Sequence, residues 1–186
     1  MIVLLIIGAG IIAVLSVVVV VLFVSIVINV ATQVPFAGTP QGRIEWLFDY
    51  LKLQPGTRLY DLGCGDGRVV FAAARRGAFA TGYEIQPLTY LRAKIVQFTH
   101  YPAAKIRFGN FHNANLANAQ IVFCFLVDAV MPSVAAQLEE KLAPGCTVVS
   151  YGFPLPGWQA NMVLEPLPPN GSKIFLYKKN WNTIAE

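Results

Sequence analysis

The sequence predicts an α/β fold: a doubly wound, mostly parallel sheet of seven strands with an antiparallel last strand, preceded by one transmembrane helix. Three observations carry this prediction. The run from Ile2 to Ile28 contains no charged residue. From Thr57 onward, β-type segments alternate with segments of helical spacing, which is typical of parallel sheets with crossover helices. A glycine-rich turn over residues 63–67 joins the first of these strands to the first helix.

The apolar run predicts a membrane-spanning helix over residues 1–30. At 1.5 Å per residue it would extend roughly 40 Å, more than the ~30 Å hydrocarbon core of a bilayer. A buried β-region is an alternative, but the run has no turn signal. A cleaved signal peptide is another, although it would need a basic start and a shorter apolar core. Because Arg43 is the first basic residue, the sequence says little about orientation.

Two further segments complete the N-terminal part of the chain. Residues 31–42 are expected to form a linker because prolines and glycines alternate there, and residues 43–186 are assigned to one domain. Apolar residues at helical spacing predict a helix over Gln41–Leu53, ended by Gln54-Pro55-Gly56.

The domain's other elements follow in order. Strands are predicted over Arg58–Leu62, Phe79–Ile85, Lys105–Phe108, Gln120–Val127, Cys146–Tyr151, Asn161–Glu165 and Lys173–Lys179. Helices are predicted over Gly67–Arg76, Pro87–Thr99 and Pro132–Leu142. The crossovers 109–119 and 153–159 leave little room for helices. The turn over Pro166–Ser172 favours an antiparallel hairpin at the end of the sheet.

The net charge and the cysteine spacing argue against a nucleic-acid partner and against a metal site. The net charge of +4 lies wholly in the part from Arg43 onward, and it is too small and too scattered to indicate a nucleic-acid partner. It would let the domain lie near anionic headgroups, although an ordinary surface balance explains it equally. Cys64, Cys124 and Cys146 lack metal-type spacing, so we expect buried thiols and no metal site.

The glycine turn and the acid before it indicate the ligand. The spacing Gly-x-Gly-x-Gly differs from the Gly-x-Gly-x-x-Gly of dinucleotide sites. Asp61, two positions before the first glycine, would repel a pyrophosphate but suits a ligand that carries positive charge. S-adenosylmethionine, with its sulfonium and amino groups, is such a ligand.

In doubly wound sheets the ligand lies beyond the carboxyl ends of the strands. Glu84 follows the turn by about twenty residues and suits a ribose diol, while an amide beside an aromatic ring after the third strand suits adenine. The predicted cofactor-binding residues are Asp61, Gly63, Cys64, Gly65, Asp66, Gly67, Glu84, Asn110 and Phe111. Phe125 and Asp128 are weak candidates for the acceptor channel; core packing and helix capping are their commoner uses.

The segment Leu59–Arg68 resembles motif I of the class I, seven-β-strand S-adenosylmethionine-dependent methyltransferases, whose fold is Rossmann-like. Later segments occur in an order similar to a small protein-lysine methyltransferase family. That family includes the mitochondrial ATP synthase c-subunit lysine methyltransferase and its adenine nucleotide translocase-methylating relative. These segments are Thr39-Pro40, Gly82–Ile85, Gly109–Phe111, Val122–Val127, Lys141–Gly145, Val148–Ser150 and Pro156–Trp158. The resemblance covers residues 39–163, but Phe125 stands where the family tends to have tyrosine.

The resemblance implies a methyltransferase that modifies lysine side chains of a protein. The enzyme would be anchored in a membrane through residues 2–28, and its protein substrate would be embedded in or associated with the same membrane. The domain would face the cytoplasm, or the mitochondrial matrix in a eukaryote. No catalytic base stands out among the residues. A lipid, a quinone or another small molecule is an alternative acceptor. A non-catalytic, cofactor-binding assembly module is a further alternative.

Overall fold

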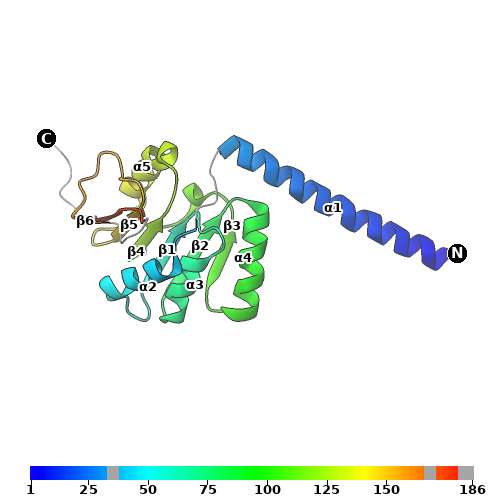
Figure 1. The fold of residues 1–186 in the computed structure, drawn as a ribbon, viewed down its shortest axis with the longest axis horizontal. Coiled ribbons are helices and arrows are strands. Elements are labelled where there is room, and N and C mark those ends of the chain that lie inside the picture. The colour runs from blue at the N-terminus through cyan, green and yellow to red at the C-terminus, as the bar shows by residue number, and fades with distance from the viewer. Residues whose placement is uncertain (33–37, 166–170, 180–186) are drawn as a thin grey trace.

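The computed structural model describes residues 1–32, 38–165 and 171–179 (Figure 1). Part of the predicted linker (33–37), most of the predicted hairpin turn (166–170) and the last residues (180–186) lie outside the described residues. Helix α1 (Ile2–Thr32) extends into the segment assigned to the linker, and α2 (Gln41–Tyr50) begins before its end. The described part of the linker that is not helical is therefore short, residues 38–40.

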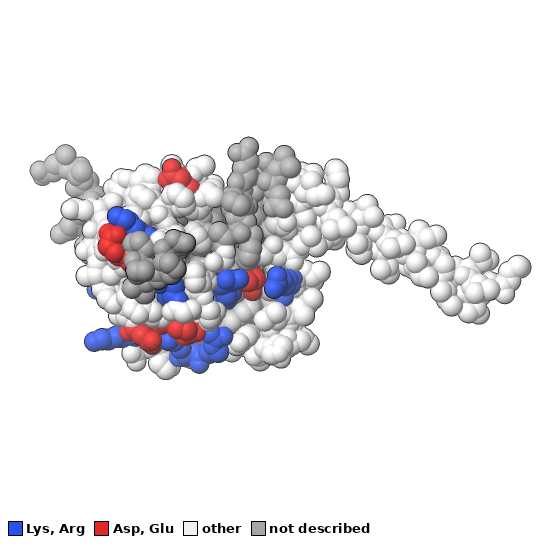
Figure 2. Space-filling view, in the orientation of Figure 1, with Lys and Arg blue, Asp and Glu red and all other residues white. Residues whose placement is uncertain are grey.

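Helix α1 projects from the domain instead of packing into it (Figure 1). Its segment Ile2–Ile28 is long and apolar enough to cross a membrane, and only 6% of its most apolar 18-residue window is buried. Figure 2 shows this helix free of charged groups along its length. Its main contact with the helices and strands of the domain is with α4 (Pro87–His100). A helix this apolar and this exposed is not the core helix of a globular domain.

The domain is built on one sheet of seven strands in the order β3-β2-β1-β4-β5-β7-β6. The strands are β1 (Arg58–Leu62), β2 (Phe79–Glu84), β3 (Lys105–Phe108), β4 (Ile121–Cys124), β5 (Thr147–Tyr151), β6 (Met162–Leu164) and β7 (Ile174–Lys178). The first five strands pair in parallel, whereas β7 is antiparallel to both β5 and β6. The predicted fold class, including the antiparallel last strand, is confirmed.

Helices cover both faces of this sheet. The first face carries α2, α3 (Arg68–Arg75) and α4, and the second carries α5 (Met131–Lys141). As expected, the crossover between β3 and β4 holds only a 3₁₀ turn, η1 (Phe111–Asn113), and a second one, η2 (Asp128–Val130), precedes α5. The strand order reverses at β1 and β4, which is where doubly wound folds bind ligands.

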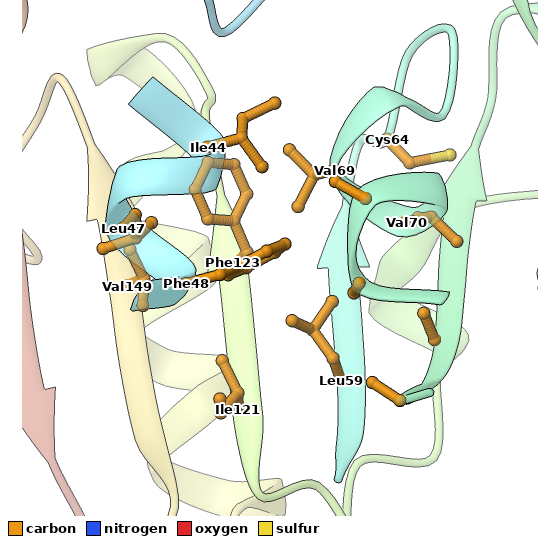
Figure 3. Packing of buried hydrophobic residues seen from close by; sticks show 14 of the residues in the cluster. Ile44, Leu47, Phe48, Leu59, Cys64, Val69, Val70, Ile121, Phe123 and Val149 are labelled. Carbon is orange, nitrogen blue, oxygen red and sulfur yellow. The ribbon is translucent and has the colours of Figure 1, made fainter. Parts of the chain in front are cut away.

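Alternation along the central strands divides the core between the two faces. In β4, Ile121 and Phe123 face the first layer, whereas Val122 and Cys124 face α5. Figure 3 shows Ile44 and Phe48 of α2 packed toward Phe123, so α2 closes the first face over the middle of the sheet.

Two predicted boundaries were wrong by three residues. The strand predicted over Gln120–Val127 ends at Cys124 because its neighbour β1 ends at the paired residue Leu62, and β5 extends only one residue beyond the paired Ser150. The helix predicted over Gln41–Leu53 ends at Tyr50 because the backbone turns at Lys52, whose φ is +51°. The earlier end of β4 matters most, because it leaves Phe125 and Leu126 in a loop that lines a cavity wall.

Candidate functional site

A cavity of about 580 Å³ opens at the carboxyl ends of the parallel strands, within the range of ~300–1,000 Å³ typical of small-molecule sites. Its wall combines the glycine turn with the ends of β2, β3 and β4. The predicted cofactor residues that line it are Asp61, Gly63, Cys64, Gly65, Asp66, Glu84, Asn110 and Phe111. Gly67, the ninth, does not line the cavity but precedes the first residue of α3.

The glycine turn brings the backbone close to the cavity. Gly63, Gly65 and Gly67 all have positive φ, the left-handed region that favours glycine. A Cβ on Gly63 would lie 2.7 Å from Leu126 Cδ2, so a side chain there would also collide with the loop after β4. The turn therefore presents backbone without side chains at the start of α3.

Gly82 in β2 makes room for this turn. A Cβ at Gly82 would lie 2.6 Å from both Cβ and Sγ of Cys64. Cys64 itself is buried, and burial, together with the carboxylates of Asp61 and Glu84, raises the pKa of its thiol well above the usual value. Cys64 is thus a neutral packing residue at the cavity floor and not a thiolate nucleophile.

Glu84 has a structural role that the sequence did not indicate. Its Oε2 accepts a hydrogen bond from the Gly65 N–H at 2.8 Å, and its Oε1 accepts one from the Gln86 N–H at 2.7 Å. Burial raises the pKa of Glu84, although these backbone donors oppose the shift. Each carboxylate oxygen keeps a second acceptor position, so Glu84 can hold the turn and still accept hydroxyl groups of a ligand.

Asp61 is the most unusual group in the cavity wall. Asp61 is only 2% exposed. Among the described residues, no group donates a hydrogen bond to its carboxylate and no cation forms an ion pair with it. Burial, and then the negative charges of Glu84 and Asp66, raises its pKa well above the ordinary value. A carboxylate buried without a partner is costly, so its position favours a ligand that brings the missing positive charge.

Asp66 has a different environment from Asp61. Arg68 pairs with it through two contacts, Nη2 to Oδ2 at 2.6 Å and Nε to Oδ1 at 2.9 Å. Burial works against ionisation, but Arg68 outweighs it and lowers the pKa of Asp66. The same guanidinium donates to the Thr39 carbonyl at 3.1 Å, which ties the segment before α2 to the glycine turn.

The residues after β3 close another side of the cavity. Asn110 Oδ1 accepts from the His112 N–H at 2.9 Å and so caps the 3₁₀ turn that carries Phe111. Gln137 of α5 donates to the Phe111 carbonyl at 2.8 Å, which fixes this turn against the second helix layer. The Asn110 amide nitrogen makes none of the hydrogen bonds found among the described residues and is available to a ligand.

The two weak candidates after β4 are placed differently. Phe125 lines the cavity together with Phe123 and Leu126, and its ring meets that of Tyr151 edge-on at 4.7 Å between centroids. Asp128 is exposed, is not part of the cavity wall and caps neither η2 nor α5.

Several residues of the cavity wall were not predicted from the sequence. They are Ile28, Gly38, Thr39, Arg68, Val69, Tyr83, Ile85, Gln86, Thr89, His112, Phe123, Leu126 and Val130. Two signals could have found some of them. Arg68 stands two positions after Asp66, which is close enough for an ion pair, and Ile85 and Gln86 directly follow Glu84. Ile28 had no such signal, because the packing of α1 against the domain brings it to the cavity.

Comparisons with known proteins agree with this geometry. The sequence model of a family described as the ANTKMT methyltransferase domain matches residues 61–162. A protein-lysine N-methyltransferase of Saccharolobus islandicus is 32% identical over 150 residues, which cover 78% of this chain and 93% of that protein. The mouse lysine N-methyltransferase of the ATP synthase c-subunit is 32% identical over 126 residues, covering 67% of this chain and 51% of the mouse protein. The chain thus matches about half of that longer relative.

Among solved structures, an RNA methyltransferase of Salinibacter ruber in complex with S-adenosyl-L-homocysteine has a similar fold. The TM-score is 0.72 at 25% sequence identity, and the match covers 81% of this chain and 98% of that chain.

Proposed function

Because this chain belongs to the ANTKMT methyltransferase family, whose cofactor is S-adenosylmethionine, we propose that it methylates lysine side chains of a protein at a membrane. The observation that carries the assignment to this cavity is the unpaired, buried carboxylate of Asp61. The lysine acceptor is supported by the names of the relatives at 32% identity, one of which acts on a component of ATP synthase.

The residues of the cavity fit this cofactor. The bare backbone of the glycine turn allows close approach of its methionine part, and Asp61 supplies the negative charge that an ammonium or sulfonium group requires. Glu84 has acceptor positions left for the ribose hydroxyls, and Asn110 with Phe111 would hold the adenine. When bound, the cofactor supplies an electrophilic methyl group on a positively charged sulfur.

The chain's own contribution to transfer is to position the acceptor and exclude water. Phe123, Phe125 and Leu126 form an apolar wall in the cavity. A free lysine has a pKa near ~10.4, and an apolar environment favours its neutral, nucleophilic form. Phe125 keeps the aromatic wall without a hydroxyl, so the wall itself offers no base, and we assign loss of the proton to solvent.

Helix α1 supports the membrane part of the proposal. It is long and apolar enough to span, and nearly all of its surface is uncovered by the rest of the chain. A tether that holds enzyme and substrate in one bilayer raises their effective concentration. The domain would lie on the side of the membrane that contains S-adenosylmethionine.

The test combines binding with identification of the methyl acceptor. The purified full chain is titrated with S-adenosylmethionine by calorimetry, as wild type, Asp61→Asn and Glu84→Gln. Membranes are then incubated with the enzyme and methyl-labelled cofactor, and labelled proteins are analysed by mass spectrometry. We expect binding by the wild type, weak or no binding by both variants, and +14 Da steps on lysine.

Other outcomes would identify other functions. Label in the organic extract instead of in protein would indicate a lipid or quinone acceptor. Label in RNA would indicate an RNA acceptor, as the name of the Salinibacter ruber RNA methyltransferase states for that enzyme. Cofactor binding without transfer to any of these would favour a non-catalytic module. Equal cofactor affinity in wild type and both variants would contradict the site itself.

A further inference from the structure

Helix α4 carries an apolar stripe that faces away from the sheet. Leu88, Leu91, Ile95 and Phe98 are exposed to 40%, 51%, 57% and 84% respectively. Their spacing of three and four residues puts them on one face of the helix, opposite Ala93, which is fully buried against the sheet. A contiguous apolar stripe on a surface helix marks a contact with something outside the domain.

The edge of the sheet beside α4 extends this surface. β3 is the edge strand, and it packs against α4. Its last residue, Phe108, is 55% exposed and lies against Tyr90 of α4, with 5.2 Å between ring centroids. Together, the exposed side chains of α4 and β3 define what we call the α4 face.

The charge of this region has one sign. Between Glu84 and Asp128 the sequence contains no Asp or Glu. The same stretch holds four basic residues, all on α4 or β3: Arg92, Lys94, Lys105 and Arg107. Lys105 and Arg107 are both exposed. Apolar side chains flanked by basic residues, without acids, are typical of surfaces that lie in the headgroup region of anionic membranes.

The position of α1 indicates where a bilayer would lie. Helix α1 packs against α4, and near the end of α1 Ser25 is only 2% exposed. Figure 1 shows α1 leaving the domain on the side of α4, and α4 running across the direction of α1 rather than along it. A helix in the membrane interface has this orientation relative to a spanning helix.

We propose that the α4 face lies on an anionic lipid surface, with Leu88, Leu91, Ile95 and Phe98 inserted between headgroups beside α1. This inference rests on the proposed membrane anchoring by α1 and adds a second, interfacial contact to it. It also orients the cavity. Ile28 of α1 lines the cavity together with Gln86 and Thr89 at the start of α4, so the cavity wall begins where the domain meets the bilayer.

The experiment measures the immersion of single positions in the full chain. The protein is reconstituted in vesicles of phosphatidylcholine with phosphatidylglycerol, with one added cysteine that carries a nitroxide label. The positions are Phe98→Cys on the α4 face, Leu15→Cys within α1, and Asp49→Cys on α2 as the matched exposed control. The native cysteines are buried, and the protein without an added cysteine gives the background. Oxygen and a water-soluble nickel complex report lipid and water contact respectively.

We expect position 98 to lose collisions with the nickel complex and gain collisions with oxygen relative to position 49. Charge reversal by Lys105→Glu with Arg107→Glu should return position 98 toward the behaviour of position 49. The matched reversal Lys52→Glu with Lys178→Glu, at exposed basic residues outside the α4 face, should leave it unchanged. Cofactor binding by calorimetry checks that each variant is folded.

Three outcomes would overturn the proposal in different ways. If position 15 is in lipid and the cofactor binds, but position 98 remains in water, the α4 face is not a membrane surface while the proposed function stands. If position 98 is shielded from both oxygen and nickel, a protein covers the face instead of lipid. If position 15 is itself in water, the anchoring by α1 fails, and the interfacial contact fails with it.

Discussion

Glu45 and Asp61, two acidic residues at opposite ends of the sheet, have opposite environments. Where α2 meets the C-terminal end of α3, Glu45 pairs with Arg75 at 2.6 Å and with Arg76 at 2.8 Å. Figure 2 shows blue and red groups in contact at that lower edge of the domain. At the carboxyl ends of the strands, Asp61 and Glu84 are buried, and neither has an ion-pair partner among the described residues.

The pKa values follow this difference. Burial acts on Glu45, but hydrogen bonds from its arginine partners outweigh it and lower its pKa. Burial acts on Asp61 without opposition, and neighbouring acids add to it, so its pKa is raised well above the ordinary value. Glu45, which stabilises the fold, is thus paired within the chain, whereas the buried Asp61 has no partner in the described residues and is placed for a ligand.

The largest expected effect is that of Asp61→Asn on cofactor binding. Removing the buried carboxylate that is placed to meet a cationic ligand should weaken binding by about 100-fold or more, which corresponds to roughly 3 kcal/mol. The ligand-free variant should melt at the same temperature as the wild type or higher, because the buried charge is gone. Calorimetry and thermal melting measure both quantities. Lower stability together with unchanged cofactor affinity would show that Asp61 stabilises the fold and does not bind the ligand.

Glu84→Gln should lower both the cofactor affinity and the melting temperature of the ligand-free protein. A glutamine has one acceptor oxygen, so only one of the Gly65 and Gln86 N–H groups keeps its present partner. An unsatisfied buried donor costs about 1–3 kcal/mol, so the ligand-free protein should melt at a lower temperature than the wild type. Cofactor affinity should fall as well. A variant that loses affinity but no stability would show that Glu84 does not hold the glycine turn.

Cofactor affinity should decrease as the pH falls. Asp61 and Glu84 have raised pKa values in the ligand-free protein, so they take up protons at a higher pH than ordinary carboxyl groups. A cationic ligand needs them ionised, and affinity should fall by up to roughly tenfold per pH unit for each proton taken up. Calorimetry across the acidic range measures this slope. It should be shallower in Asp61→Asn, and equal slopes in the two proteins would assign the titration elsewhere.

The same shift predicts a stability difference without ligand. Because the pKa of Asp61 is higher folded than unfolded, the folded state binds the extra proton, and its ionisation destabilises the fold as pH rises above about 3.9. The free energy of unfolding of the wild type, minus that of Asp61→Asn, should therefore fall with rising pH until the folded pKa is passed.

The smallest effect is expected for Glu45→Gln at the other end of the sheet. Its ion pairs are partly exposed, and such pairs contribute about 0–1 kcal/mol. Because the folded pKa of Glu45 is lowered, this stabilisation should be present above about pH 4.3 and disappear as the pH falls through the folded value. Cofactor affinity should not change. A large loss of affinity would mean that the paired acids also serve the ligand.

The sequence predicted much of this site because its residues are local to strand ends. Asp61, Glu84 and Asn110 each follow directly from a strand pattern, and parallel strands end at one edge of a sheet. It did not predict that Glu84 supports the turn through Gly65, nor that Arg68 links Asp66 to Thr39. These contacts join segments 19 and 29 residues apart, and no local pattern encodes such a meeting.

The sequence by itself determined the fold class, the apolar helix and the glycine turn, because hydrophobic periodicity and glycine spacing act over a few residues. The tertiary structure decided which acids are paired. Glu45 and Asp61 are both carboxylic acids, and the sequence alone does not distinguish their environments. Packing brings two arginines to Glu45, whereas it buries Asp61 beside Glu84 and Asp66. The charge environment of a residue depends on what folding places around it, and that decided which acid of this chain faces the cavity without a partner.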